Sequence, residues 1–248
     1  DSKTADDFYD FVIGNFPFAS QSPADRRYIN LSPTLHDFFF LKSLDQTRPG
    51  GIVMSVTSAG TMDKKSKSVR LALAKKAELV AAFRLPSGAF EKYAGTSVVT
   101  DILIFKKRET PLTDFAGERW IDLGETTSSN GKKFTVNQYF IDNPSHVLGT
   151  LDFGSGSTYG VPSMIVKRPG NLQQLMEALP DKVQAGTYQN VKAKDNISYV
   201  SNNTDEREGS LIVDKGKLMV VQGDVLAPAD QVKKYSVKSE NETAKRED

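Results

Sequence analysis

The chain has 248 residues, a formal net charge of +1 at pH 7, no cysteine and two histidines, His36 and His146. This length suffices for one large domain or two small ones. The near-neutral charge gives no bulk electrostatic sign of a nucleic acid or an anionic membrane as partner. The absence of cysteine excludes disulfides, thiolate metal sites and cysteine nucleophiles. Two histidines far apart in sequence argue against a metal site and a Ser-His-Asp relay, although one histidine would suffice for the relay.

The first element predicted from the sequence is a short apolar strand from Phe11 to Ile13. It runs into a turn, Gly14–Phe18, that carries one amide and two aromatic rings. Ligands of open α/β sheets bind beyond the carboxyl ends of the strands, which makes this turn a candidate ligand site. The alternative is that Phe16 and Phe18 are core residues next to an ordinary turn. The polar loop over 19–31 that follows has the length of a binding segment or lid.

The next elements are a helix, a strand, a second helix and two further strands. The first helix begins near 32–34, with a hydroxyl at its cap and Pro33 just inside, and Pro49-Gly50-Gly51 stops it. Mostly apolar runs predict strands at 52–57, 78–85 and 98–107, as expected of strands buried on both faces, and a helix is predicted at 66–76. Because no helix joins the last two strands, we expect them to pair antiparallel. The predicted fold class is therefore α/β, half of a doubly wound sheet with a reversed last strand.

After residue 108 the chain becomes rich in glycine, serine, threonine and asparagine. A short helix is predicted over 171–179 and a hairpin over 211–221, with Asp-Lys-Gly at its turn. The charged tail over 233–248 is expected to be disordered. We therefore divide the chain into a domain at 1–108, a mixed, β-containing accessory or target-recognition-like extension at 109–232, and the tail.

Six sequence pieces occur in one order, and together they indicate a family. They are DFVIGNFPF (10–18), HDFFFLKSLD (36–45), RPGGIV (48–53), TSAGTMDK (57–64), FRLPSGAF (83–90) and AGTSVVTDIL (94–103). This order resembles the γ-class N6-adenine DNA methyltransferases. It is most similar to the methylase region of large helicase–methylase proteins of phages and mobile elements, some of which act against restriction. The resemblance covers residues 8–108 and continues weakly to the hairpin.

The resemblance implies the C-terminal half of a Rossmann-like class I methyltransferase sheet and an adenine flipped out of the duplex. In such enzymes, the asparagine side chain and the next carbonyl accept hydrogen bonds from the exocyclic amine, while the last aromatic stacks on the base. Carried over, the catalytic turn is Asn15-Phe16-Pro17-Phe18. The family pattern is Asn-Pro-Pro-Phe or Asn-Pro-Pro-Tyr, so Phe16 replaces a proline. The resemblance also makes His36 a structural or capping residue and Asp101 a strand-pairing or turn-fixing one.

The cofactor that the resemblance implies is S-adenosylmethionine, and the partner is DNA. The family's glycine-rich loop and acidic cofactor residue precede the first strand seen here, and no G-x-G-x-x-G follows any strand in these 248 residues. We therefore expect that this chain alone does not bind the cofactor and that the missing half lies upstream or on another polypeptide. Without a strand from that half, the strand at 8–13 would be an open edge.

Six basic residues are weak candidates for phosphate contacts, with a solvated face as the alternative: Arg26, Arg27, Lys64, Lys65, Lys67 and Arg70. No apolar run approaches the roughly 20 residues that span a bilayer, and the N-terminus lacks signal-peptide features. We therefore expect a soluble protein that is cytoplasmic or carried in a phage particle. Two hypotheses follow: a partial adenine methyltransferase, or a catalytically inactive methylase-like module that binds DNA or protein in an antirestriction or phage-associated assembly.

Overall fold

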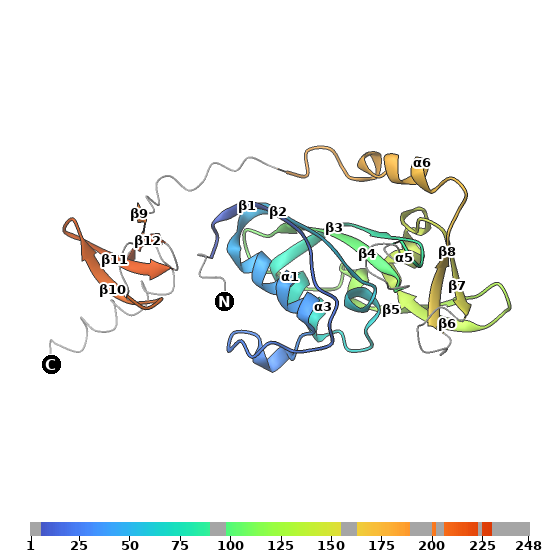
Figure 1. Ribbon diagram of the computed structural model, residues 1–248, viewed down its shortest axis with the longest axis horizontal. Coiled ribbons are helices and arrows are strands. Elements are labelled where there is room, and N and C mark those ends of the chain that lie inside the picture. Colours follow the sequence, from blue (N-terminus) through green and yellow to red (C-terminus); the bar gives the residue numbers. More distant parts are fainter. Residues whose placement is uncertain are drawn as a thin grey trace. The chain divides into compact units, whose positions relative to one another are not determined.

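The computed structural model describes residues 6–89, 98–154, 163–188, 200–201, 206–222 and 225–229 (Figure 1). The chain forms two compact units: Tyr9–Gln189, and a smaller one made of Asp1–Phe8 with Asn190–Asp248. The boundary expected after residue 108 falls inside the larger unit, and the tail at 233–248 lies outside the described residues. Within the described part of the chain, no helix is both long and apolar enough to cross a membrane.

The larger unit is built on a four-stranded sheet with the order β1-β2-β4-β3. The strands are β1 (Tyr9–Asn15), β2 (Thr47–Ser58), β3 (Ala77–Arg84) and β4 (Thr100–Lys107). β1 runs parallel to β2, whereas β4 runs antiparallel to both β2 and β3. The carboxyl ends of β1, β2 and β3 therefore meet the amino end of β4 along one edge, which we call the carboxyl edge.

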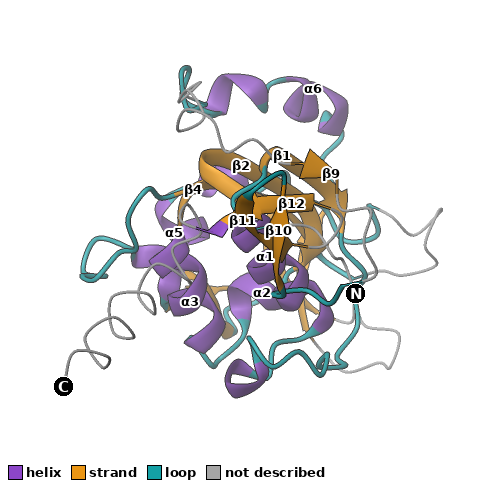
Figure 2. Cartoon of the chain, turned by 90° about the vertical axis from the view of Figure 1, so that its left-hand side faces the viewer, coloured by secondary structure: helices purple, strands orange, loops and turns teal. Residues whose placement is uncertain are grey.

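Helices cover both faces of this sheet (Figure 2). On one face lie α1 (Leu35–Gln46) and α3 (Ser68–Lys76), whose apolar residues share a core with Val53 of β2 and Leu103 of β4. On the other face lies α6 (Leu172–Glu177), which packs near Ala81 and Phe83 of β3. Strand residues alternate between the faces, so Ala81 and Ala82 belong to different cores.

Two local details differ from the sequence expectations. Thr34 is the N-cap of α1, so Pro33 precedes the helix. The helix ends at Gln46, before Pro49-Gly50-Gly51, and residues 47–51 already belong to β2. A Cβ at Gly51 would lie 2.8 Å from the carbonyl oxygen of Asp10, so glycine permits the close approach of β1. A short helix, α2 (Gly60–Asp63), follows β2.

The segment after β4 packs against the sheet. It contains a hairpin of β5 (Leu123–Thr127) and β6 (Lys133–Asn137), the helix α5 (Gln138–Asp142), and the antiparallel pair β7 (Thr150–Gly154) and β8 (Ser163–Lys167). Short 3-10 turns lie at Ile29–Leu31, Arg119–Ile121, Pro144–His146 and Pro180–Lys182. Trp120, Val136 and Phe140 belong to the same core as α1 and α3. This segment is thus integrated with the sheet.

The smaller unit contains an antiparallel sheet with the order β10-β11-β12-β9. Its strands are β9 (Val200–Ser201), β10 (Leu211–Asp214), β11 (Lys217–Gln222) and β12 (Val225–Pro228). The hairpin predicted over 211–221 is confirmed by β10 and β11. Lys215 and Gly216, with φ of 47° and 79°, form its two-residue turn, in which positive φ at both positions matches the twist of the strands.

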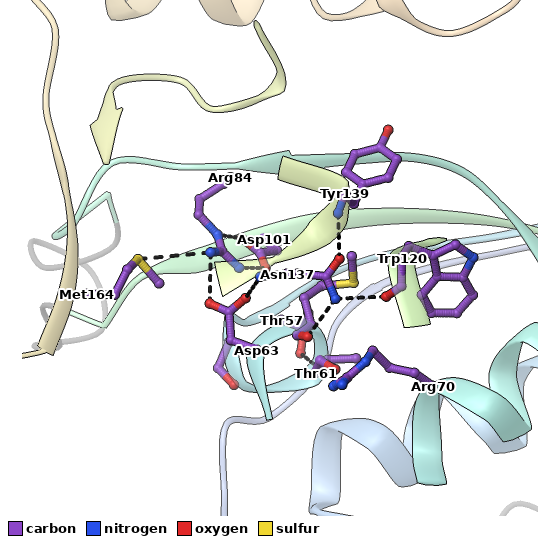
Figure 3. A network of polar contacts seen from close by, with 12 residues as sticks. Thr57, Thr61, Asp63, Arg70, Arg84, Asp101, Trp120, Asn137, Tyr139 and Met164 are labelled. Carbon is purple, nitrogen blue, oxygen red and sulfur yellow. Dashed lines mark hydrogen bonds and ion pairs between the residues drawn. The ribbon is translucent and has the colours of Figure 1, made fainter. Parts of the chain in front are cut away.

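A buried arginine connects the sheet to the segment after β4 (Figure 3). Arg84 is fully buried, and its Nε and Nη2 each lie 2.8 Å from a carboxylate oxygen of Asp101. Its Nη1 lies 2.8 Å from Asp63, and the guanidinium stands 4.0 Å from the ring centroid of Phe140. Burial alone would lower the pKa of Arg84, but Asp101 and Asp63 raise it above its usual value, so the side chain stays charged.

Asn137 extends this arrangement to the backbone. Its N–H donates to Asp63 at 2.8 Å, and its side-chain amide donates to the carbonyls of Met62 and Trp120, also at 2.8 Å. Its Oδ1 accepts the N–H of Tyr139 at 2.9 Å and so caps α5. Asp63, Arg84, Asp101 and Asn137, which we call the Arg84 network, join β3, β4, α2 and β6.

We predict that Arg84→Met destabilises the larger unit by about 3–5 kcal/mol, because two carboxylates lose their partner in or near the core. Urea unfolding followed by the fluorescence of Trp120, the sole tryptophan, measures the change. Arg119→Met is the matched control, since Arg119 is 65% exposed in its pair with Asp142, and should leave the midpoint nearly unchanged. Equal shifts in the two variants would contradict this account.

Candidate functional site

The Asn15-Phe16-Pro17-Phe18 turn lies at the carboxyl edge, directly after β1. Asn15 pairs in register with Val56, and the N–H of Phe16 donates to the Val56 carbonyl at 3.2 Å. Asn15 and Pro17 are exposed and Phe18 is half-buried. Phe16 is buried and packs against Phe39 and Phe40, with ring centroids 5.6 and 4.8 Å away. Of the two aromatic residues, Phe16 is therefore the core residue, while Asn15 is exposed.

His36 lies near the same edge, at the amino end of α1. It is 6% exposed, and its Nε2 lies 2.9 Å from Thr34 Oγ1 and 3.3 Å from Ser58 Oγ. Asp37 is 3.8 Å from the same nitrogen. A Ser-His-Asp relay needs the serine and the carboxylate on opposite ring nitrogens. Because both approach Nε2 here, the arrangement at His36 is not a hydrolytic relay.

The second histidine, His146, packs between α5 and β3. His146 Nδ1 lies 2.9 Å from the hydroxyl of Tyr139, which also accepts the N–H of Ala82 at 3.1 Å. The ring packs against Phe83 with centroids 4.8 Å apart. His146 therefore helps to hold α5 on β3.

The six candidate phosphate-binding residues separate into three groups. Arg26, Lys64 and Lys65 are exposed. Arg27 lies 3.3 Å from Asp45, and Lys67 lies 3.2 Å from Asp122. Arg70 is a correction: it is 1% exposed, and its guanidinium donates to the carbonyls of Ile121 and Lys64 at 2.7 and 2.8 Å. These buried bonds leave Arg70 unable to meet a phosphate without unfolding its surroundings.

Within the described strands, β1 is an edge strand that pairs with β2 alone. Phe11 and Ile13 are 48% and 68% exposed, which is unusual for apolar residues of a strand. The ring of Tyr188 lies 4.6 Å from that of Phe11 and accepts a hydrogen bond from Arg48 at 3.0 Å through its hydroxyl. The chain after α6 thus covers the amino-terminal part of β1, while Ile13, next to the turn, remains open.

Sequence reasoning missed the Arg84 network, although it singled out Asp101 as a residue that pairs strands or fixes a turn. Thr57, Asp101 and Arg84 lie in one register row across β2, β4 and β3. The available signal was an arginine at the end of β3 and an aspartate near the start of β4, each next to a run of apolar residues. Charged residues in such positions are buried only when they are paired.

We predict that the free energy of unfolding falls as the pH is lowered from about 7.5 to about 5.5, and falls less in His36→Gln and His146→Gln. Burial lowers the pKa of both histidines; Lys64 adds to this at His36, where Asp37 opposes it, and Lys182 adds to it at His146. Below the unfolded value of about 6.5, the unfolded chain therefore binds more protons than the folded chain. Urea titrations at several pH values measure the slopes, and an unchanged slope in both variants would contradict the assignment.

Comparison with known proteins gives one relative in sequence. No protein-family model matches the chain. It is 31% identical over 116 residues to Defense against restriction protein B of Escherichia phage P1. The match covers 45% of this chain and 5% of that protein, so the chain spans a small part of that relative's length.

Solved structures with some likeness include three modification or methyltransferase subunits of type I restriction systems. The subunit of a putative type I restriction enzyme from Vibrio vulnificus is 21% identical, covers 42% of this chain and 24% of its own, and has a TM-score of 0.34. The methyltransferase subunit from Streptococcus thermophilus is 14% identical, with coverages of 71% and 36% and a TM-score of 0.33. The EcoKI M protein is 15% identical, with coverages of 70% and 47% and a TM-score of 0.32. We base no inference on scores this low.

The sequence relative and the motifs both indicate a phage protein that acts against restriction. The pieces that carry the resemblance are those of a methylase-like region, and the relative is by name an antirestriction protein. The chain is thus similar to part of a phage antirestriction protein, which confirms its resemblance to phage proteins that act against restriction.

Proposed function

We propose that this chain contributes the adenine-binding half of an N6-adenine DNA methyltransferase. The observation that carries the proposal is the Asn15-Phe16-Pro17-Phe18 turn at the carboxyl end of β1, in which Asn15 is exposed. In open α/β sheets this edge is where ligands bind. An amide, a carbonyl and an aromatic ring in one turn provide what an extrahelical adenine needs: two acceptors for its amine and a surface for stacking.

Three residues of the turn have separate tasks in this proposal. The side-chain oxygen of Asn15 and the carbonyl of Phe16 accept hydrogen bonds from the exocyclic amine, and Phe18 stacks on the base. Acceptors aimed at the amine favour the positive charge that develops as its nitrogen attacks a methyl group. The bond from the Phe16 N–H to Val56 and the burial of the Phe16 ring restrain the residue that proline restrains in the family through its fixed φ.

The described residues do not fit S-adenosylmethionine. No glycine-rich G-x-G-x-x-G turn follows β1, β2, β3 or β4 in the sequence, and such a turn is what lets the backbone approach a nucleotide cofactor closely. We therefore assign no part of the cofactor site to this chain. In the proposal, that half is supplied by residues outside these 248, on the same or another polypeptide.

In the proposal, the cofactor half and the DNA contact different elements of this chain. A strand of the cofactor half would pair along β1, where Ile13 is 68% exposed, because an edge strand is a template for a further strand. Lys64 and Lys65 are exposed on the segment that follows α2, close to the carboxyl edge. They are the cations we propose for contacts with the DNA backbone.

A second candidate is a catalytically inactive methylase-like module that binds DNA or protein in an antirestriction assembly. The similarity to an antirestriction protein favours it, as does Phe16 in place of the family's proline. The two candidates differ in whether a DNA adenine becomes methylated once a cofactor half is present.

We predict that Phe18→Ala lowers the affinity for a duplex with one unpaired adenine by about 5- to 150-fold, the loss of one base–aromatic stack. Fluorescence anisotropy of a labelled oligonucleotide measures it. Phe115→Ala is the control: Phe115 is also half-buried but follows the carboxyl end of β4, at the opposite edge of the sheet. Equal losses of affinity in both variants, or no binding of the oligonucleotide by the unaltered chain, would contradict the proposal.

A further inference from the structure

The turn that carries Asn15 is held at both of its ends by different elements. At its start, the N–H of Phe16 donates to the carbonyl of Val56 in β2 at 3.2 Å. At its end, the N–H of Leu35, the first residue of α1, donates to the carbonyl of Ala19 at 3.2 Å. The shape of the turn therefore depends on how far the carboxyl end of β2 lies from the amino end of α1.

His36 bridges these two elements. Its Nε2 lies 2.9 Å from Oγ1 of Thr34, the N-cap residue of α1, and 3.3 Å from Oγ of Ser58, the last residue of β2. The bridge thus connects the two elements that anchor the turn. A Cβ added at Gly60 would lie 3.2 Å from Ser58 Oγ and 3.8 Å from His36 Nε2, so the chain just after β2 is packed against the bridge.

Counting donors assigns the tautomer of His36. The hydroxyl of Thr34 gives its single proton to the carboxylate of Asp37 at 2.6 Å, because an ionised carboxylate only accepts. Thr34 Oγ1 must then accept from His36, which puts the proton on Nε2. The same N–H is directed at both Thr34 and Ser58. Asp37 therefore orients His36 through Thr34, without contacting its Nδ1.

The surroundings favour the neutral form of this histidine. Nδ1 of His36 and Oδ1 of Asp37 are buried and have no hydrogen-bond partner among the described residues. A second proton on the ring would add a buried donor without an acceptor. Burial lowers the pKa of His36, Asp37 opposes this and Lys64 adds to it.

We propose that His36 is a positioning residue: its Nε2–H joins α1 to β2 and so sets the geometry of the Asn15–Ala19 turn. The structural part of this inference stands on the contacts alone. Its consequence for adenine recognition rests on the proposed function, since His36 itself is buried behind the turn and does not touch the base.

The test is amide hydrogen exchange of the whole chain, resolved by NMR at Phe16 and Leu35 and compared with Val53 in the core of β2. His36→Leu should speed exchange at Phe16 and Leu35 by about 3- to 10-fold relative to Val53, the effect of losing one hydrogen bond. His36→Gln, which keeps an amide donor near the position of Nε2, should restore the ratios. Ser58→Ala removes one partner while leaving the buried histidine in place, and should loosen Phe16 in the same direction.

His146→Leu is the control, because it deletes the other histidine and should change exchange at all three amides together. Unchanged ratios in His36→Leu and Ser58→Ala would overturn the inference, and so would the same pattern in His146→Leu. The exchange ratios do not depend on DNA. If the unaltered chain fails to bind unpaired adenine, the proposed function falls while these ratios still decide the role of His36. If it binds, His36→Leu should weaken binding and His36→Gln should recover it.

Discussion

A fully buried guanidinium cannot be left without counter-charges, and the larger unit is arranged around that requirement. Arg84 meets Asp101 across the β3–β4 pair and Asp63 from α2 (Figure 3). Desolvation makes an unpaired charge there very costly, so the elements that carry the carboxylates have one arrangement that satisfies all three groups. Asn137 then attaches the β5–β6 hairpin to the same point. The segment after β4 therefore holds the sheet and α2 in place.

These contacts also restrain the chain at the carboxyl edge, where the candidate site lies. The chain from Thr57 to Lys64 is held by α1 through His36, by α3 through Arg70, and by β3 through Arg84. A site fixed by rigid elements keeps its geometry better than one on a free loop. Asn15 lies next to this segment, because β1 and β2 run parallel with Asn15 paired to Val56. Among the described strands, β1 pairs with β2 alone, and the proposal places the cofactor half along its other side.

The parts of the fold that could be predicted are those that depend on residues close together in the sequence. Apolar runs predicted β1 to β4, and the Asp-Lys-Gly turn predicted the β10–β11 hairpin. The Asn15 turn was recognisable because its motif is contiguous. The Arg84 network, the burial of Arg70 and the integration of Trp120 were not predictable, since each depends on partners far away in sequence. Charge alone suggested that Arg70 faces a phosphate, whereas three backbone carbonyls surround it. The place of Phe16 in the core likewise follows from Phe39 and Phe40, one helix later.

The central claim is that the turn after β1 receives an adenine. The most direct measurement is a crystal structure of the chain with an oligonucleotide that carries one extrahelical adenine. The account predicts that the exocyclic amine lies within hydrogen-bond distance, roughly 3 Å, of the Asn15 side-chain oxygen and the Phe16 carbonyl, with the base stacked on Phe18. An adenine bound at another surface, with the Asn15 amide left in solvent, would contradict it.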